Sequence, residues 1–179
     1  MLRKRFRADD DDDDDASVMV IDNNIYYRGE IKEPTATEFC KVLRDITNKQ
    51  KDMKDGCVRI FISSGGGDAF AGLTMFEHIK SSKKYIDVIT IADGYVASAA
   101  TFPILAGTRR LMGETSTMLI HQVSSGQFGY FKAKEMENEA RNTATLMNIV
   151  YSLYEKHSSV CGKRLNKILD EEKLLTFKE

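Results

Sequence analysis

The order of strand, small-residue turn and helix limits this chain to few folds. Residues 58–62 are mostly β-branched or aromatic, residues 63–67 read Ser-Ser-Gly-Gly-Gly, and residues 70–79 carry apolar side chains at helical spacing. A second unit of the same kind follows over residues 85–105. Strands joined through helices pair in parallel, because a parallel pair needs a long crossover connection. The pattern therefore predicts an α/β fold in which crossover helices cover a sheet.

The rest of the chain extends this order. In the second unit we expect a strand over 85–91, a turn at Gly94 and a short helix over 97–105 that bends or ends near Pro103. Thr35, with a glutamate three residues later, has the spacing of a capping box and is the expected start of the first helix. The other expected elements are strands over 18–21, 25–27, 109–112 and 117–120, one long helix over 131–157 and a last short helix over 162–170.

Charge is distributed unevenly along the chain. The formal net charge is −1, with 26 basic and 27 acidic residues, but four basic residues lie in 1–7 and residues 9–15 are all aspartate. Adjacent carboxylates repel one another and bury nothing, so we expect 1–16 to be a disordered arm and 17–179 to form one domain. The near-neutral balance argues against nucleic-acid binding. No apolar run approaches the ~20 residues that cross a bilayer, so no membrane partner is expected.

Cysteine spacing and the N-terminal segment indicate the compartment. Cys40, Cys57 and Cys161 are widely separated, which fits neither a zinc site nor a disulfide framework. The basic start is followed by aspartates, where a secretory signal would need an apolar segment. We therefore expect a protein that is not secreted, in the cytoplasm or an equivalent reducing compartment, with no metal.

Two turns at strand–helix junctions could carry chemistry, because ligands in α/β folds collect where strands end and helices begin. Three glycines in residues 63–67 would let amide groups converge on an anion, although a plain tight turn has the same composition. Ser98 lies among alanines at an expected helix start, where its hydroxyl would be accessible near amide donors. The same serine could instead cap or line a packed helix terminus.

A nucleophilic serine needs a base, and the chain has three histidines. His78 lies inside an expected helix and His157 at the end of another, which suit structural or solvated positions. His121 directly follows the expected strand 117–120, so its ring could reach a groove at the strand end or pack in the core. A third group would have to orient the imidazole. The carboxylates available late in the chain are Asp170, Glu171 and Glu172.

Several motifs occur together in a fixed order: Phe-Ile-Ser-Ser-Gly-Gly-Gly at 61–67, Ala-Gly-Leu at 71–73, the small-residue segment 94–100 and Met-Leu-Ile-His-Gln at 118–122. With a late carboxylate, this order resembles the ClpP family, the proteolytic subunits of Clp protease, which are serine peptidases. The resemblance covers residues 18–179. It implies the ClpP/crotonase-like fold, a sheet with crossover helices and a long handle helix, with no metal or organic cofactor.

The resemblance implies a role for each matched residue. Ser98 would be the acyl-forming nucleophile, and His121 the general base that later protonates the leaving amine. The backbone amides of Gly67 and Ala99 would form the oxyanion hole, where hydrogen bonds act on charge that develops in the transition state.

The third member of the triad departs from the family pattern. The family has an aspartate shortly before a Leu/Met-Ser/Thr pair, and counting back from the Leu-Thr pair at 175–176 gives Glu172. Glutamate would have to hold the imidazole with one more methylene, so Asp170 is the alternative triad acid. The other departures are Gly65 for a common proline, Ala99 for methionine and Val123 for proline.

Family members form two stacked heptameric rings that enclose the active sites, and a long helix with its preceding loop is the handle between the rings. Residues 123–157, with Gly-Gln-Phe-Gly at 126–129, match this handle. Either a ring-to-ring contact or a contact within the subunit would explain its helical stripe of Met136, Ala140, Thr143, Met147 and Val150. The family's closing helix and strand would follow the last residue here, so a divergent or shortened member is expected.

The leading hypothesis is a serine endopeptidase core subunit that hydrolyses unfolded proteins or peptides inside an oligomeric chamber. The chain lacks a phosphate-binding GxxxxGK loop ending in Ser or Thr, so a separate AAA+ unfoldase would supply its substrates. One alternative is a non-catalytic ring subunit in which the change to glutamate has disabled the triad. The other is a crotonase-like acyl-CoA enzyme that uses glycine-turn amides as an oxyanion hole.

Overall fold

The computed structural model describes residues 17–123 and 132–178. Its strands are β1 Ser17–Ile21, β2 Asn24–Arg28, β3 Cys57–Ser64, β4 Asp87–Ala97, β5 Arg109–Met112, β6 Thr117–Leu119 and β7 Leu174–Thr176. Its helices are α1 Glu33–Gln50, α2 Ala69–Ser82, the 3-10 turn η1 Ser98–Ala100, α3 Thr101–Ala106, α4 Ala133–His157 and α5 Gly162–Glu171. The expected arm over 1–16 and the 126–129 loop lie outside the described residues.

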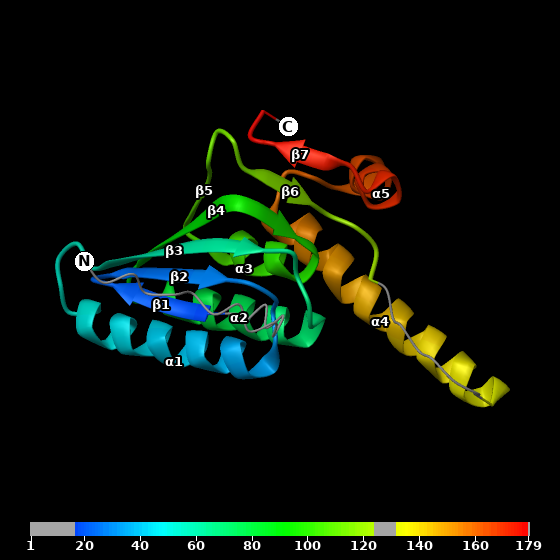
Figure 1. The fold of residues 1–179 in the computed structure, drawn as a ribbon, viewed down its shortest axis with the longest axis horizontal. Helices are drawn as coiled ribbons and strands as arrows, with labels where there is room; N and C mark the ends of the chain where they lie inside the picture. The colour runs from blue at the N-terminus through cyan, green and yellow to red at the C-terminus, as the bar shows by residue number, and fades with distance from the viewer. Residues whose placement is uncertain (1–16, 124–131, 179) are drawn as a thin grey trace, which may run out of the picture.

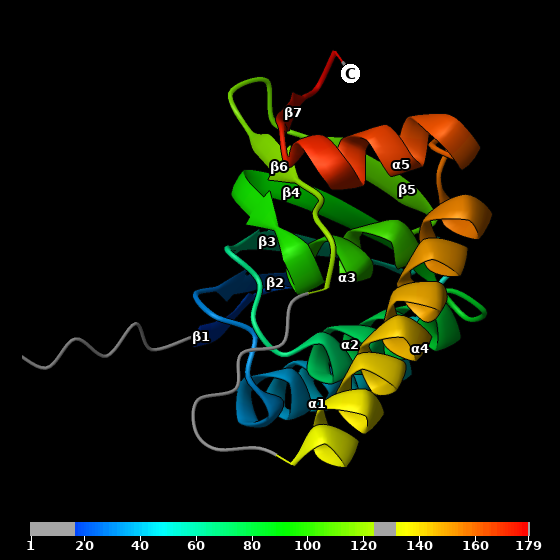
Figure 2. The ribbon, with the colours of Figure 1, turned by 90° about the vertical axis from the view of Figure 1, so that its right-hand side faces the viewer.

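The strands form one sheet in the order β1-β2-β3-β4-β6-β7, and β5 also pairs with β4. The pairs β2–β3, β3–β4, β4–β5 and β4–β6 are parallel, while β1–β2 and β6–β7 are antiparallel. Figures 1 and 2 show α1, α2 and α3 on the same side of this sheet. The predicted α/β fold with crossover helices is confirmed.

Gly94 does not form the predicted turn, because β4 continues through it to Ala97. On the β3 side Ile62 pairs with Ala92 but Ser64 pairs with Val96, so β4 holds extra residues at a bulge. Gly94, with a φ of 86°, adopts the left-handed backbone there. The opposite edge of β4 pairs with β5 before the bulge and with β6 after it. The pairing with β6 extends β4 to Ala97, next to Ser98.

Two predicted helix signals were also wrong. α1 begins at Glu33 after Lys32, and Thr35 lies inside the helix, where its hydroxyl donates to the Lys32 carbonyl at 3.0 Å. Pro34 supplies a helical φ in the first turn, where no backbone donor is needed, so the helix starts before Thr35. At Pro103 the helix was expected to bend or end, and an end is wrong, because this proline is the third residue of α3, where no backbone donor is needed, and the helix continues to Ala106.

The main core lies between the sheet and helices α1, α2 and α3. Its largest fully buried side chains include Tyr27, Phe39 and Phe76. β7 was not predicted, because only its antiparallel pairing with β6 defines so short a strand. No helix within residues 17–123 and 132–178 is long and apolar enough to cross a membrane.

The long helix α4 divides into an exposed half and a packed half. Figure 1 shows its N-terminal part extending beyond the sheet and the other helices. Met136 there is 62% exposed, whereas Val150, Leu153 and Tyr154 near the other end are buried. The apolar stripe predicted along this helix is therefore explained by contacts within the subunit only toward its C-terminal end.

The sheet–helix core predicts a clear difference between two leucines. Leu43 of α1 is 1% exposed and Leu111 of β5 is 54% exposed. Leu43→Ala should lower the free energy of unfolding by about 2–5 kcal/mol, because it leaves a cavity, and Leu111→Ala by less than about 1 kcal/mol. Urea denaturation at one fixed protein concentration measures both. Equal losses for the two variants would contradict this assignment of the core.

Candidate active site

Ser98 lies at the junction between β4 and η1, with its side chain half-buried. Its φ of 54° is in the left-handed region, which costs a residue other than glycine roughly 1–3 kcal/mol. The hydroxyl of Thr101 donates to the Ser98 carbonyl at 2.6 Å and helps to hold this conformation. A strained strand-to-helix turn of this kind is also where α/β-hydrolases hold their nucleophilic serine.

The glycine turn packs directly against Ser98. A Cβ atom on Gly66 would lie 2.6 Å from the Ser98 Cβ and 2.8 Å from the Ala97 carbonyl oxygen. The same position is 3.2 Å from the Ala99 nitrogen, so the turn faces the peptide group after the serine. Gly66 and Gly67 also have φ values of 101° and 137°, which favour glycine. The turn needs glycine because two backbone segments approach closely here.

Hydrogen bonds fix the direction of the Gly67 amide. The Ile31 amide donates to the Gly66 carbonyl at 2.7 Å, and the Asp68 amide donates to the Ile31 carbonyl at 2.9 Å. In a trans peptide the carbonyl and the following N–H point in opposite directions. The described residues contain no cis peptide bond, so the Gly67 N–H points away from Ile31. Gly67 and Ala99 both line one cleft beside Ser98.

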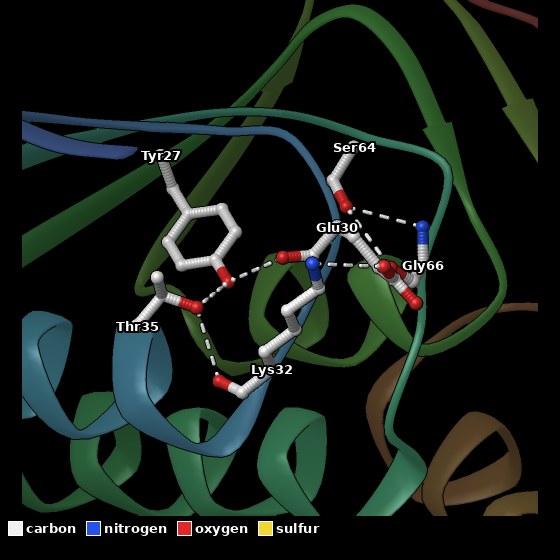
Figure 3. Close-up of polar contacts among 6 residues, drawn as sticks. All are labelled: Tyr27, Glu30, Lys32, Thr35, Ser64 and Gly66. Atoms are coloured by element: carbon white, nitrogen blue, oxygen red, sulfur yellow. Dashed lines mark hydrogen bonds and ion pairs between the residues drawn. The ribbon is translucent and has the colours of Figure 1, made fainter. Parts of the chain in front are cut away.

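A polar cluster holds the segment that contains Ile31, and Figure 3 shows it beside the glycine turn. The buried Tyr27 hydroxyl donates to the Glu30 carbonyl at 3.1 Å and lies 2.9 Å from the Thr35 hydroxyl. Thr35 in turn donates to the Lys32 carbonyl. Burial raises the pKa of Tyr27. These bonds anchor the chain on both sides of Ile31, and so they support the bond from Ile31 to Gly66.

The cleft has a volume of about 630 Å³ and brings four of the predicted site residues together. Its lining includes Gly67, Ser98, Ala99 and His121. Apolar side chains from α3 and α4 line another part of it, among them Phe102, Leu146 and Ile149. Both Ser98 and His121 are described, and no hydrogen bond joins them in this structure. The cleft could accept an extended peptide with an apolar side chain.

Glu172 and Asp170 are not among the residues that line the cleft. Glu172 caps α5 with a φ of 48°, and it immediately precedes Lys173 and β7. In the antiparallel ladder Thr117 pairs with Thr176 and Leu119 with Leu174. If this register is continued two residues toward His121, Glu172 comes opposite the histidine and on the same side of the ladder.

Asp170 has a different contact. The Gln122 side-chain amide donates to the Asp170 carboxylate at 2.8 Å. Asp170 therefore binds the residue next to His121, and at least one of its oxygens is already engaged. No cluster of three or more His, Cys, Asp or Glu side chains suited to a metal ion occurs within the described parts of the chain.

Sequence reasoning did not find two residues that support this site. Thr101 lies three residues after Ser98 and is fully buried, and Tyr154 of α4 packs against it with a hydrogen bond between the two hydroxyls. A threonine three residues after the serine is a weak local signal, since Ser and Thr side chains often bond nearby carbonyls. Tyr154 has no local signal, because its partner is distant in the sequence.

Comparison with known proteins places the chain in a family. A family model described as Clp protease matches residues 8–179, so the chain belongs to the Clp protease family. It is 30% identical over 130 residues to an "ATP-dependent Clp protease proteolytic subunit" of Mesostigma viride, covering 72% of this chain and 54% of the relative. A protein of the same description from Oltmannsiellopsis viridis is 28% identical over 134 residues, covering 74% of this chain and 66% of the relative.

A solved structure shares the fold. A ClpP1 mutant from Listeria monocytogenes superposes with a TM-score of 0.71 at 24% identity, covering 88% of this chain and 84% of the other. The predicted ClpP/crotonase-like fold and the predicted family are therefore confirmed. This chain spans less than two thirds of the length of each of the two curated relatives.

The contact between Gly66 and Ser98 predicts unequal effects for neighbouring glycines. Gly66→Ala should lower the free energy of unfolding by about 1–3 kcal/mol, because its Cβ meets Ser98 and its φ is left-handed. It should also slow labelling of Ser98 by a fluorophosphonate, a reagent for activated serines. Gly65→Ala is the control, since its Cβ would have only Tyr95 nearby, at 3.9 Å. Thermal unfolding and intact-protein mass measure the two effects, and tolerance of Gly66→Ala would contradict the close approach.

Proposed function

We propose that this chain is a subunit of a serine endopeptidase that cleaves peptide bonds through an acyl-enzyme on Ser98. The observation that carries the proposal is the left-handed Ser98 at the end of β4, packed against the Gly66–Gly67 turn and sharing one cleft with His121. Membership of the Clp protease family supports the same reaction class. Two amide donors and one base beside a strained serine are the parts that acyl transfer needs.

In the proposed reaction the Ser98 Oγ attacks the carbonyl carbon of the scissile peptide while His121 accepts the hydroxyl proton. The carbonyl oxygen becomes an oxyanion, and the N–H groups of Gly67 and Ala99 donate hydrogen bonds to it. His121 then protonates the departing amine as the C–N bond breaks. Water, deprotonated by His121, attacks the ester and releases the second product and the free serine hydroxyl.

Glu172 is the proposed partner of His121. The continued register of β6 and β7 supports this choice over Asp170, which already binds Gln122. A carboxylate at this position would hold the imidazole tautomer that accepts the serine proton and would stabilise the imidazolium. Glu172 is exposed at the left-handed end of α5, and the triad is complete only when its side chain turns toward His121.

An assembly that encloses the cleft is part of the proposal. Large apolar side chains are exposed on β1 and the first half of α4, including Met19, Ile21 and Met136. Side chains of this kind favour burial against other subunits. Stacked heptameric rings fed by an AAA+ unfoldase are the arrangement that the family resemblance implies, and unfolded polypeptides would be the substrates.

A non-catalytic ring subunit is the second candidate. The exposed position of Glu172 and its absence from the cleft favour it. Turnover of a short peptide with an aminomethylcoumarin leaving group separates the two candidates, because a non-catalytic subunit produces no Ser98-dependent fluorescence.

Ser98→Ala tests the proposed nucleophile. It should reduce peptide turnover at least ~10⁴-fold and abolish fluorophosphonate labelling, because acylation has no other nucleophile. Ser159→Ala, an exposed serine after α4, should leave both unchanged. Native mass spectrometry of each variant verifies equal assembly. Full activity of Ser98→Ala would exclude the proposed mechanism.

The choice of carboxylate is tested by two isosteric changes. Glu172→Gln should lower kcat by about 10²–10⁴-fold, because a neutral amide orients the imidazole poorly. Asp170→Asn should change kcat by less than about threefold, because only a contact with Gln122 is altered. Steady-state kinetics on the coumarin peptide measures both. The reverse order of effects would assign the role to Asp170.

A further inference from the structure

A buried chain of hydrogen bonds connects α4 to the backbone of Ser98. The Tyr154 hydroxyl of α4 is bonded to the Thr101 hydroxyl, and Thr101 donates to the Ser98 carbonyl at 2.6 Å. Thr101 is fully buried and Tyr154 is 2% exposed. Burial of this kind makes each bond strong and makes a missing partner costly.

The direction of each hydrogen follows from the donors available. A carbonyl oxygen only accepts, so the single hydroxyl hydrogen of Thr101 goes to Ser98. Tyr154 must then donate its hydrogen to the Thr101 oxygen. Burial raises the pKa of the Tyr154 phenol, so the group remains protonated at neutral pH and keeps this direction. The hydrogens therefore run from Tyr154 through Thr101 to Ser98.

The accepting carbonyl belongs to the peptide group that carries the Ala99 N–H. Because this peptide is trans, a bond that fixes the Ser98 carbonyl toward Thr101 turns the Ala99 N–H in the opposite direction. Hydrogen bonds in series also polarise one another, so a bonded carbonyl makes the N–H of the same peptide a better donor. The Ala99 nitrogen faces Gly66, and Ala99 lines the cleft.

The second proposed donor is built in the same way. The peptide that carries the Gly67 N–H has its carbonyl bonded by the Ile31 amide at 2.7 Å. In both peptides a bond on the carbonyl side fixes the N–H on the cleft side. The Ser98 carbonyl accepts both the backbone N–H and the hydroxyl of Thr101, and only the hydroxyl bond, with Tyr154 behind it, can be removed by a side-chain mutation.

We propose that Thr101 and Tyr154 are positioning residues that orient and polarise the Ala99 amide of the oxyanion hole. This inference rests on the proposed serine peptidase function. Thr101 does not line the cleft, so its effect reaches substrate through the peptide between Ser98 and Ala99, whereas Tyr154 itself lines the cleft and Tyr154→Phe changes only its hydroxyl. The role differs from simple core packing, because it acts on the transition state more than on substrate binding.

The test uses the full assembled chain and removes the hydroxyls one at a time. Thr101→Val should lower kcat for the coumarin peptide about 10-fold with KM changed less than about twofold, less than the 10²–10³-fold cost of deleting a donor outright. It should lower the affinity for a peptide boronic acid by a similar factor, because the tetrahedral boronate adduct places an oxygen in the oxyanion hole. Thr101→Ser should restore kcat, because it restores the hydroxyl. Tyr154→Phe should lower kcat about threefold, because Thr101 still donates to Ser98.

Matched controls come from the same fold. Thr47 is buried in α1 and donates to the Leu43 carbonyl at 2.7 Å, so Thr47→Val deletes a similar bond far from the cleft. Tyr151→Phe removes a hydroxyl from the same helix as Tyr154. Both controls should leave kcat and boronic acid affinity unchanged even if the melting temperature falls.

Each outcome decides the inference. An unchanged kcat in Thr101→Val, or a loss that Thr101→Ser does not recover, overturns it. If Thr101→Val does not assemble, the comparison of Tyr154→Phe with Tyr151→Phe decides the question. Equal kcat values for these two variants overturn the inference. If Ser98→Ala turns over the peptide as fast as the wild-type protein, the proposed function itself is wrong. If turnover depends on Ser98 but Thr101→Val has the wild-type kcat, only the role of Thr101 and Tyr154 is wrong.

Discussion

The site depends on one backbone constraint, the left-handed conformation of Ser98. An L-residue with a side chain occupies this region only when its surroundings over-determine it. Gly66 allows the neighbouring turn to approach without a Cβ, and Gly72 does the same from α2, since a Cβ there would lie 2.8 Å from the Ala99 carbonyl oxygen. The Thr101 hydroxyl donates a further hydrogen bond to the Ser98 carbonyl. The strained turn of Ser98 and the glycines that approach it closely therefore depend on one another.

Most of the element order could be predicted from the sequence, because periodic apolar residues report which face of an element is buried. The failures occurred where a local signal had two solutions. Gly94 suits a turn or a bulge, and the pairing of β4 with both β5 and β6 selects the bulge. Thr35 could cap a helix or lie within its first turns, and Pro34 selects the second. β7 carries no periodicity of its own.

The site was predictable to the extent that its parts are local. Ser98 and His121 each lie at the end of a strand, and parallel strands bring such ends to one edge of a sheet. The carboxylate could not be chosen in the same way, because Glu172 and Asp170 are two residues apart and only tertiary contacts, the β6–β7 register and the bond from Gln122 to Asp170, distinguish them. The contact between Thr101 and Tyr154 joins residues that are 53 positions apart, so no window of sequence contains it.

The origin of Tyr154 in α4 has a consequence for the order of events in the cell. During synthesis Ser98 and its glycine turn emerge from the ribosome well before α4 exists. On the proposed role of Tyr154 and Thr101, the Ala99 amide of a half-made subunit lacks part of the hydrogen-bond chain that orients it. The docking of α4 would then be the last step in building the proposed oxyanion hole, after the strand, the glycine turn and the serine have already been synthesised.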